Sequence, residues 1–294
     1  MKMRSWLFVP GDSERKLAKV AAIGADVVVI DLEDAVADHG KIPARKLATQ
    51  WLSSHRQQVT AGNGFQRWVR INQLDGHHWR EDLATVMAGQ PDGIIIPKAI
   101  GPDQLRMFSA ELYEVEQRNG ITPNTTRIMP MVGETAKTAL TISAYASEEL
   151  PRLGGMTWGS EDLANALGAS RKRDAAGQWT DVFRMVRAQV LLCARASGVA
   201  PVDTLHSSFR DLDGLKAAAE ASFADGFAGM LAIHPDQVAV INAAFSPGKE
   251  QVAEAQAIVD LFAANPGAAA LSLEGRMVEQ PHLMQARRVL ESAR

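Results

Sequence analysis

The sequence predicts a (β/α)8 barrel (a TIM barrel) followed by a C-terminal helical appendage. Eight short apolar runs recur along the chain, and each is bounded by turn residues as buried strands are. A segment with helical features separates each run from the next, which is typical of parallel α/β folds. The length of 294 residues also suits a barrel, because such barrels reach about 200–250 residues as one domain. We place the barrel at residues 1–246 and the appendage at residues 247–294.

The first half of the chain contains four of the expected strands. The run Val27-Val28-Val29-Ile30 is continuous and β-branched, which marks a strand covered on both faces. The strands are expected at Ser5–Val9, Asp26–Ile30, Trp68–Asn72 and Gly93–Lys98. A first helix, capped by Asp12 or Ser13, is expected to end near Ile23 before Gly24. Further helices are expected at Pro43–Arg56, which a Gly-containing loop follows, at Glu81–Ala88 and at Pro102–Asn119.

The second half repeats the alternation and then adds the appendage. Strands are expected at Arg127–Met131, Met156–Gly159, Val199–Asp203 and Ala228–Ile233. Helices are expected at Thr135–Glu149, Glu161–Leu167, Asp181–Ser197 and Asp213–Ala224. The polar segment Gly168–Thr180 has no periodicity and predicts a mobile loop over the carboxyl edge of the barrel. In the appendage we expect a helix at Glu250–Ala263, an extended piece at Ala268–Leu273 and a final helix from Pro281.

Composition excludes several classes of function. The formal net charge is -3 and aromatic residues are not interleaved with basic runs, so nothing favours nucleic acid as a partner. The single cysteine, Cys193, cannot form an internal disulfide and lies in a helical apolar run, which predicts a buried thiol in a reducing cytoplasm. No apolar run approaches the ~18 residues of a membrane span, and the run before Pro10-Gly11 is too short for a signal peptide. We therefore expect a cytoplasmic protein.

Polar side chains follow almost every predicted strand. Because a barrel brings the carboxyl ends of its strands to one mouth, these side chains are expected to gather there. Carboxylates from four successive strand ends would repel one another strongly, and a divalent cation would neutralise them directly. Any one of them can also be structural. The set is Asp31, Glu33, Asp34, Arg70, Asn72, Lys98, Glu134, Glu161, Asp162, Asp203 and His234.

Glu134 and Asp162 are the predicted metal ligands, because carboxylate oxygens are hard ligands suited to Mg²⁺. Alternatively, Glu134 is a helix N-terminal carboxylate and Asp162 caps its short helix. Arg70 lies within an apolar strand and needs a partner, either a substrate carboxylate or a neighbouring Asp. Lys98 is either catalytic or paired with Glu134 or Asp31. Structural roles are more typical for Glu161, Asp203 and His234.

Eight short motifs lie along the chain in a fixed order. They are Phe8-Val9-Pro10-Gly11-Asp12, Asp31-Leu32-Glu33-Asp34-Ala35-Val36, Val69-Arg70-Ile71-Asn72, Pro97-Lys98, Glu134-Thr135-Ala136, Gly159-Ser160-Glu161-Asp162-Leu163, Ile233-His234-Pro235 and Gly275-Arg276-Met277-Val278. Taken together in this order, they resemble the citrate lyase β-subunit-like proteins. These belong with the malyl-, citramalyl- and citryl-CoA lyases in the class II 2-oxoacid aldolase superfamily. The resemblance runs from about Arg4 to Arg288.

The resemblance implies a trimeric or hexameric TIM-barrel enzyme with a metal at the mouth. Mg²⁺, with Mn²⁺ as an alternative, would be bound by Glu134 and Asp162, and Arg70 would bind the carboxylate and carbonyl oxygen of a 2-oxoacid. The neighbouring carboxylates would surround the metal without ligating it, Glu33 and Asp34 by holding its bound waters. These surrounding carboxylates are Asp31, Glu33 and Asp34.

The appendage departs from the family pattern. In many relatives it reaches a neighbouring subunit and supplies an aspartate in a Met-hydrophobic-Asp-x-Pro segment, whereas this chain reads Met277-Val278-Glu279-Gln280-Pro281. Glu279 is thus a candidate acid/base group whose carboxylate lies one methylene further from the backbone. A misplacement near 1 Å can cost on the order of 10²-fold in rate, so the change bears on the choice of substrate.

Three functions fit these residues. The first is a Mg²⁺-dependent carbon–carbon lyase that cleaves or forms a 3-hydroxyacyl-CoA, with CoA thioester and 2-oxoacid as its small-molecule partners. The second is an acyl-CoA thioesterase built on the same metal site. The third is the β subunit of a citrate lyase complex whose substrate is carried on an acyl-carrier protein. Arg15 and Lys16 are candidates for contacts with the CoA phosphates.

Overall fold

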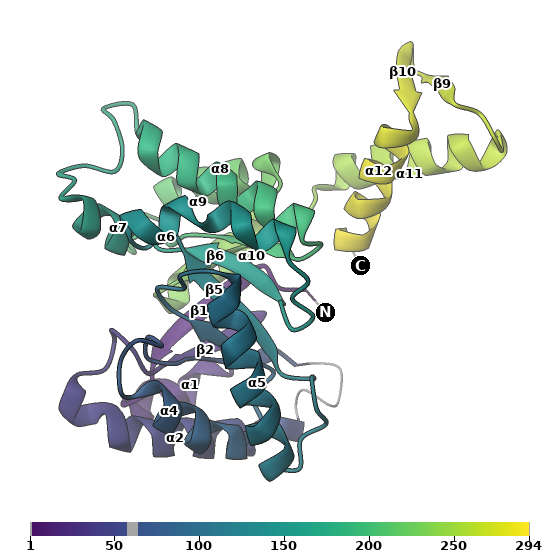
Figure 1. Ribbon diagram of the computed structural model, residues 1–294. Coiled ribbons are helices and arrows are strands. Elements are labelled where there is room, and N and C mark those ends of the chain that lie inside the picture. The colour runs from purple at the N-terminus through teal and green to yellow at the C-terminus, as the bar shows by residue number, and fades with distance from the viewer. Residues whose placement is uncertain (1, 58–63, 294) are drawn as a thin grey trace. The chain divides into compact units, whose positions relative to one another are not determined.

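The computed structural model describes residues 2–57 and 64–293 and contains a closed barrel of eight parallel strands (Figure 1). Each strand pairs with the next, and β8 closes the barrel against β1. The predicted TIM barrel is confirmed. The strands are β1 (Ser5–Pro10), β2 (Val27–Asp31), β3 (Gln66–Arg70), β4 (Gly93–Ile96), β5 (Arg127–Val132), β6 (Gly155–Trp158), β7 (Ala200–Asp203) and β8 (Gly229–Ala232).

Helices follow the strands on the outside of the barrel. They are α1 (Glu14–Val20), α2 (Lys41–Ser54), α4 (Trp79–Val86), α5 (Pro102–Arg118), α6 (Ala136–Leu140), α7 (Ser160–Leu167), α8 (Asp181–Ala196), α9 (Leu212–Asp225) and α10 (Pro235–Ala244). Short 3-10 helices are η1 (Asp38–Gly40), η2 (Met87–Gly89) and η3 (Ile142–Ser147). The Gly-containing loop predicted after Arg56 lies largely outside the described residues.

One helix prediction needs correction, and one further helix was missed. The helix expected at Thr135–Glu149 is broken into α6 and η3. At the break the hydroxyl of Thr141 donates to the carbonyls of Ile100 and Thr138, and such local hydroxyl bonds compete with helix propagation. Helix α10 was not predicted: Val238, Ile241 and Phe245 do recur at the helical spacing i, i+3, i+7, but the apolar residues Ala239 and Val240 between them obscure that stripe in the sequence.

The barrel interior changes from apolar to charged towards the mouth. Val29 on β2 and Trp68 on β3 belong to the buried cluster inside the barrel. Because side chains alternate along a strand, Asp31 and Arg70, two residues further on, point the same way. Trp6 and Trp68 contact each other edge to face below them, with ring centroids 5.0 Å apart. The ion pair between Asp31 and Arg70 therefore lies directly above the apolar core of the barrel.

The appendage is a separate compact unit that begins at Ala243. It consists of α11 (Lys249–Ala264), β9 (Ala270–Leu273), β10 (Arg276–Glu279) and α12 (Gln280–Ala293) around its own apolar cluster. The expected extended piece is β9, whereas β10 was missed. The hairpin turns at Glu274 and Gly275, both with positive φ (48° and 79°), as a type I′ turn requires. Glu-Gly lacks the Asn or Asp that usually signals this turn.

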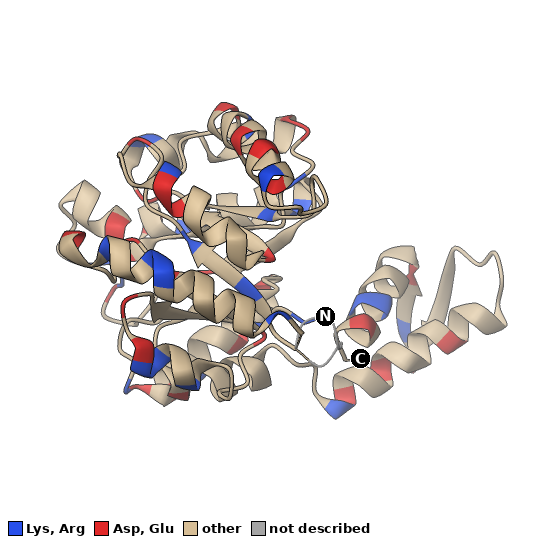
Figure 2. Ribbon diagram, turned by 90° about the horizontal axis from the view of Figure 1, so that it is seen from below, with Lys and Arg blue, Asp and Glu red and all other residues tan. Residues whose placement is uncertain are grey.

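Other features of the described chain bear on function. Cys193 in α8 is buried as predicted; its Sγ donates to the carbonyl of Ile142 at 3.1 Å, and burial raises the pKa of the thiol. No helix among the described residues combines the length and apolarity needed to cross a membrane. Figure 2 shows acidic and basic residues interspersed over the barrel helices, with no uniformly basic face in that view.

Candidate active site at the barrel mouth

Arg70 at the end of β3 is held by two carboxylates from the β2 end. Its Nε and Nη2 donate to the two oxygens of Asp31 at 2.8 and 2.6 Å, and its Nη1 lies 2.9 Å from Glu33 Oε2 as an ion pair. Burial alone would lower the pKa of Arg70, but the charge and hydrogen bonds of Asp31 raise it instead. Of the two partners expected for Arg70, a substrate carboxylate or a neighbouring Asp, the structure thus supplies the Asp, and the pairing fixes a buried positive charge at the mouth.

Lys98, just after β4, pairs with a different carboxylate from those expected. Its Nζ lies 2.5 Å from Glu33 Oε1, 3.5 Å from Asp34 Oδ2 and 3.6 Å from Asp162 Oδ1. The expected side-chain pairing with Glu134 or Asp31 is therefore wrong, because the loop after β2 brings Glu33 closer. Burial would lower the pKa of Lys98, but the hydrogen bond and charge of Glu33 raise it. Lys98 is consequently a fixed cation and not a base at neutral pH.

Glu134 is held in the site by a hydrogen bond from the backbone of Lys98. Lys98 has φ +50°, a strained value for a side-chain-bearing residue, and its N–H donates to Glu134 Oε2. Glu134 Oε1 is buried without a hydrogen-bond partner. Burial raises the pKa of Glu134 to about 8, and the charges of Asp162 and Glu33 add to that rise. A buried carboxylate oxygen with no partner is a site that a cation would satisfy.

Gly159 makes room for this carboxylate. A Cβ at Gly159 would lie 2.6 Å from Glu134 Oε1 and 2.8 Å from its Cγ. The residue has φ −110°, so the backbone itself does not demand glycine. The space does, because the Glu134 side chain fills the volume that any other residue would occupy.

Asp162 lies in the first turn of α7, beside Glu134, with its side chain one third exposed (33%). The alternative in which Asp162 caps the helix is wrong, since Gly159 occupies the N-cap and no side chain caps it. Glu161 instead forms an ion pair with Lys172, the structural role expected for it. Glu134 and Asp162 are two carboxylates from neighbouring strand ends, one buried and one open to solvent. This donor set fits Mg²⁺, which takes one or two carboxylates and keeps several waters.

The remaining predicted residues lie in other surroundings. Asp203 is buried and accepts hydrogen bonds from groups on β6, α8 and α9: Trp158 Nε1, Arg187 Nε and Ser222 Oγ. His234 is partly exposed and stacks on the ring of Phe209. These contacts support the structural roles that the sequence favoured for both residues.

The candidates for CoA binding lie on α1, and the candidate for proton transfer lies on β10 of the appendage. Arg15 and Lys16 are exposed on α1, the helix that follows β1 at the carboxyl end of the barrel. Glu279 is the last residue of β10 in the appendage, and its backbone N–H donates to His282 Nδ1. Their roles stay predictions.

Lys41 and Asp82 were missed by reading strand ends alone. Both are buried beside the site, at 7% and 0% exposure. The signal was present in α2, where the helical period puts Lys41 and Arg45 on the same face as Ala44, Ala48 and Trp51. A cation on the buried face of a helix must have a partner inside the fold.

The chain matches the HpcH/HpaI aldolase/citrate lyase family model over residues 4–235, which covers the barrel and every residue of the cluster at its mouth. The chain belongs to this family. A (3S)-malyl-CoA thioesterase of Cereibacter sphaeroides is 34% identical over 292 residues, covering 99% of this chain and 94% of that protein. The mitochondrial citramalyl-CoA lyase of Mus musculus is 30% identical over 301 residues, covering 99% and 86%.

Solved structures of the family are also similar. The CitE protein of Mycobacterium tuberculosis, in complex with magnesium, acetoacetate and coenzyme A, superimposes with a TM-score of 0.77 at 32% identity. The match covers 99% of this chain and 98% of that chain, so it includes the appendage as well as the barrel. Membership of the aldolase/citrate lyase family therefore rests on both sequence and fold.

Proposed function

We propose that this protein is a Mg²⁺-dependent carbon–carbon lyase acting on a 3-hydroxyacyl-CoA that carries a carboxylate on its hydroxyl carbon. The observation that carries the proposal is the buried, unpartnered Oε1 of Glu134 beside Asp162, with the cation Arg70 at the same mouth. The magnesium, acetoacetate and coenzyme A named with the similar CitE structure support the proposal, as does the citramalyl-CoA lyase relative.

Each residue of the mouth has a proposed role. Glu134 and Asp162 would hold Mg²⁺, which when bound supplies Lewis acidity that makes the substrate hydroxyl easier to deprotonate. Arg70, locked on Asp31, would stabilise negative charge on the oxygens of the 2-oxoacid half. Lys98, held by Glu33, adds a second fixed positive charge beside them. These groups are in place before substrate binds, so little reorganisation is needed during reaction.

Cleavage would begin at the hydroxyl group of the substrate and end with a proton on the thioester half. A base removes the hydroxyl proton, the bond between the hydroxyl carbon and the carbon next to the thioester breaks, and the hydroxyl carbon becomes the carbonyl of a 2-oxoacid. The electron pair of the broken bond passes to the thioester half as an enolate, which then takes a proton at carbon. We propose Glu279 of a neighbouring subunit as the acid/base group, within a cytoplasmic homotrimer or homohexamer.

A thioesterase is the second candidate, because the relatives named (3S)-malyl-CoA thioesterase are 34% identical to this chain. The same site would direct water to the thioester carbonyl and release free CoA. A product assay with malyl-, citramalyl- and citryl-CoA in the presence of Mg²⁺ separates the two. We expect acetyl-CoA together with a 2-oxoacid. Free CoA together with the intact hydroxy acid (malate, citramalate or citrate) would instead identify the protein as a thioesterase.

A further inference from the structure

We propose that Lys41 is a positioning residue: it fixes the acidic loop Asp31–Asp34 so that Glu33, and not Asp162, neutralises Lys98. The inference rests on the proposed function, because it concerns how the Mg²⁺ ligand Asp162 is kept available.

The hydrogen bonds of the Lys41 ammonium to described residues go to the main chain of that loop. Its Nζ donates to the carbonyls of Leu32 and Glu33, each at 2.7 Å, although the residue is only 7% exposed. A buried ammonium is costly, and here it is satisfied by two backbone oxygens of a loop that carries three carboxylates. Lys41 therefore fixes the main chain immediately before and after the Cα of Glu33.

A second route from α4 holds the same carbonyl. Asn72 Nδ2 donates to the Leu32 carbonyl at 3.0 Å, and Asn72 is itself held by Asp82 Oδ2 through its Nδ2 and its backbone N–H, at 2.7 and 2.9 Å. Asp82 is completely buried and accepts from Arg45 Nε at 2.7 Å. Helices α2 and α4 thus hold the acidic loop together.

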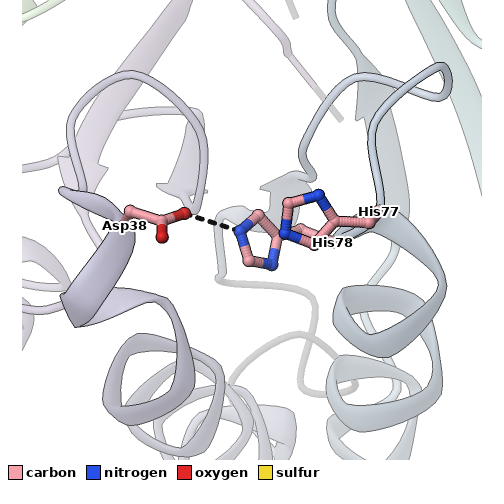
Figure 3. A group of neighbouring side chains, drawn as sticks. All are labelled: Asp38, His77 and His78. Carbon is pink, nitrogen blue, oxygen red and sulfur yellow. Dashed lines mark hydrogen bonds and ion pairs between the residues drawn. The ribbon is translucent and has the colours of Figure 1, made fainter.

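The chain of contacts continues to the surface at Asp38, His77 and His78 (Figure 3). These three side chains offer ligand atoms within 4.8 Å of one another, as a metal site would. Arg45 Nη2, which can only donate, lies 3.1 Å from His78 Nδ1, so the His78 proton is on Nε2, which contacts Asp38 Oδ1 at 2.7 Å. Both ring nitrogens of His78 are engaged, so this group extends the network and is not a metal centre.

The position of Glu33 decides the partner of Lys98. Glu33 lies between two cations, 2.5 Å from Lys98 Nζ and 2.9 Å from Arg70 Nη1. Lys98 Nζ is also 3.6 Å from Asp162 Oδ1. If Glu33 withdraws, the ammonium of Lys98 is free to close on Asp162 and compete with Mg²⁺ for that carboxylate.

The test is Mg²⁺ titration of the purified protein by calorimetry. Lys41→Met is the variant, and Lys46→Met, at an exposed position on the same helix, is its matched control. We expect Lys41→Met to weaken Mg²⁺ binding by about 10-fold, the lower end of the loss seen when groups around a metal site are removed. Lys46→Met should bind like the wild type. Adding Lys98→Met to Lys41→Met should restore most of the affinity, because the competing ammonium is gone.

Two results would overturn the inference. One is wild-type affinity in Lys41→Met. The other is an equal loss of affinity in the double variant, which would mean that Lys41 acts by general stability and not through Lys98. If Lys41→Met does not fold, Lys41→Gln, whose amide can donate to one carbonyl, is expected to show the same loss and the same rescue. A wild type that binds Mg²⁺ but cleaves no CoA ester would overturn the proposed function and leave this inference standing.

Discussion

Gly159→Ala adds a single methyl group at the point where the β6 end meets the candidate metal ligand Glu134. The backbone at Gly159 has φ −110° and ψ 98°, a conformation that alanine adopts without strain. The added Cβ, however, would lie 2.6 Å from Glu134 Oε1, 2.8 Å from Cγ and 3.0 Å from Cδ. Ordinary carbon contacts begin near 3.5 Å. The carboxylate therefore has to retreat from Gly159 by most of an Å.

That displacement sets the size of the expected effect. A misplacement of about 1 Å in a catalytic group costs on the order of 10²-fold in rate, which corresponds to about 2.7 kcal/mol of transition-state stabilisation. We therefore expect kcat/KM for carbon–carbon cleavage to fall about 100-fold in Gly159→Ala, and Mg²⁺ binding to weaken by at least about 10-fold.

The assay compares initial rates of CoA-ester cleavage and Mg²⁺ titrations for wild type, Gly159→Ala and Gly248→Ala. Gly248 is the matched control, because the nearest atom to its added Cβ is Gln251 Oε1 at 3.8 Å and its φ is −67°. The control should stay close to wild type in both measurements. A Gly159→Ala variant within about threefold of wild type would show that the Glu134 carboxylate does not need this position, and the proposed metal site would be wrong.

Three further predictions follow from the same geometry. Arg70→Lys cannot bind Asp31 with two parallel hydrogen bonds, so we expect a loss of about 3 kcal/mol in the free energy of unfolding, measured with denaturant, and a strong loss of activity; unchanged stability would contradict the pairing. The pKa of Glu134 is raised to about 8 in the folded protein, whereas the unfolded chain releases the same proton near pH 4.5. Because the folded state therefore holds a proton that the unfolded state does not, the stability of the metal-free protein should fall as pH rises from about 5 to 8. Thermal melts in a chelator check this, and Glu134→Gln should flatten the slope. Glu279→Ala should lower the rate of cleavage about 10²-fold if Glu279 transfers the proton. Equal rates for wild type and Glu279→Ala across a CoA-ester panel would exclude Glu279 as the acid/base group. A Glu279→Asp variant that gains activity on malyl- or citramalyl-CoA would mean that the native substrate is a different ester.

The barrel could be predicted from sequence because its strands carry an unambiguous signal. A continuous run such as Val27–Ile30 has no polar face, so it needs cover on both sides, and eight such runs separated by helices leave few other folds. The helix break after Leu140 could not be predicted in the same way. It depends on a hydroxyl of Thr141 reaching Ile100, a contact between segments far apart in the chain.

The residues of the candidate site could be predicted from the sequence, but the ion pairs that they form with one another could not. Strand ends identify Asp31, Arg70, Glu134 and Asp162, because a barrel brings those ends together. Which carboxylate takes Lys98 depends on the path of the loop after β2, and that path is fixed by Lys41 from a helix. Residue spacing along one strand does not encode such a contact, so Glu33 could not be identified from sequence as the partner of Lys98.

The buried thiol of Cys193 has a practical consequence for following the enzyme at work. It is the only cysteine of the chain, it is 4% exposed, and burial keeps it in the unreactive protonated form. A cysteine introduced at Met277, whose side chain is exposed on β10 two residues before Glu279, would then be the one thiol that a maleimide dye reaches. The fluorescence of the attached dye during turnover would report when the surroundings of the hairpin that carries Glu279 change. No dye would be attached to the barrel itself.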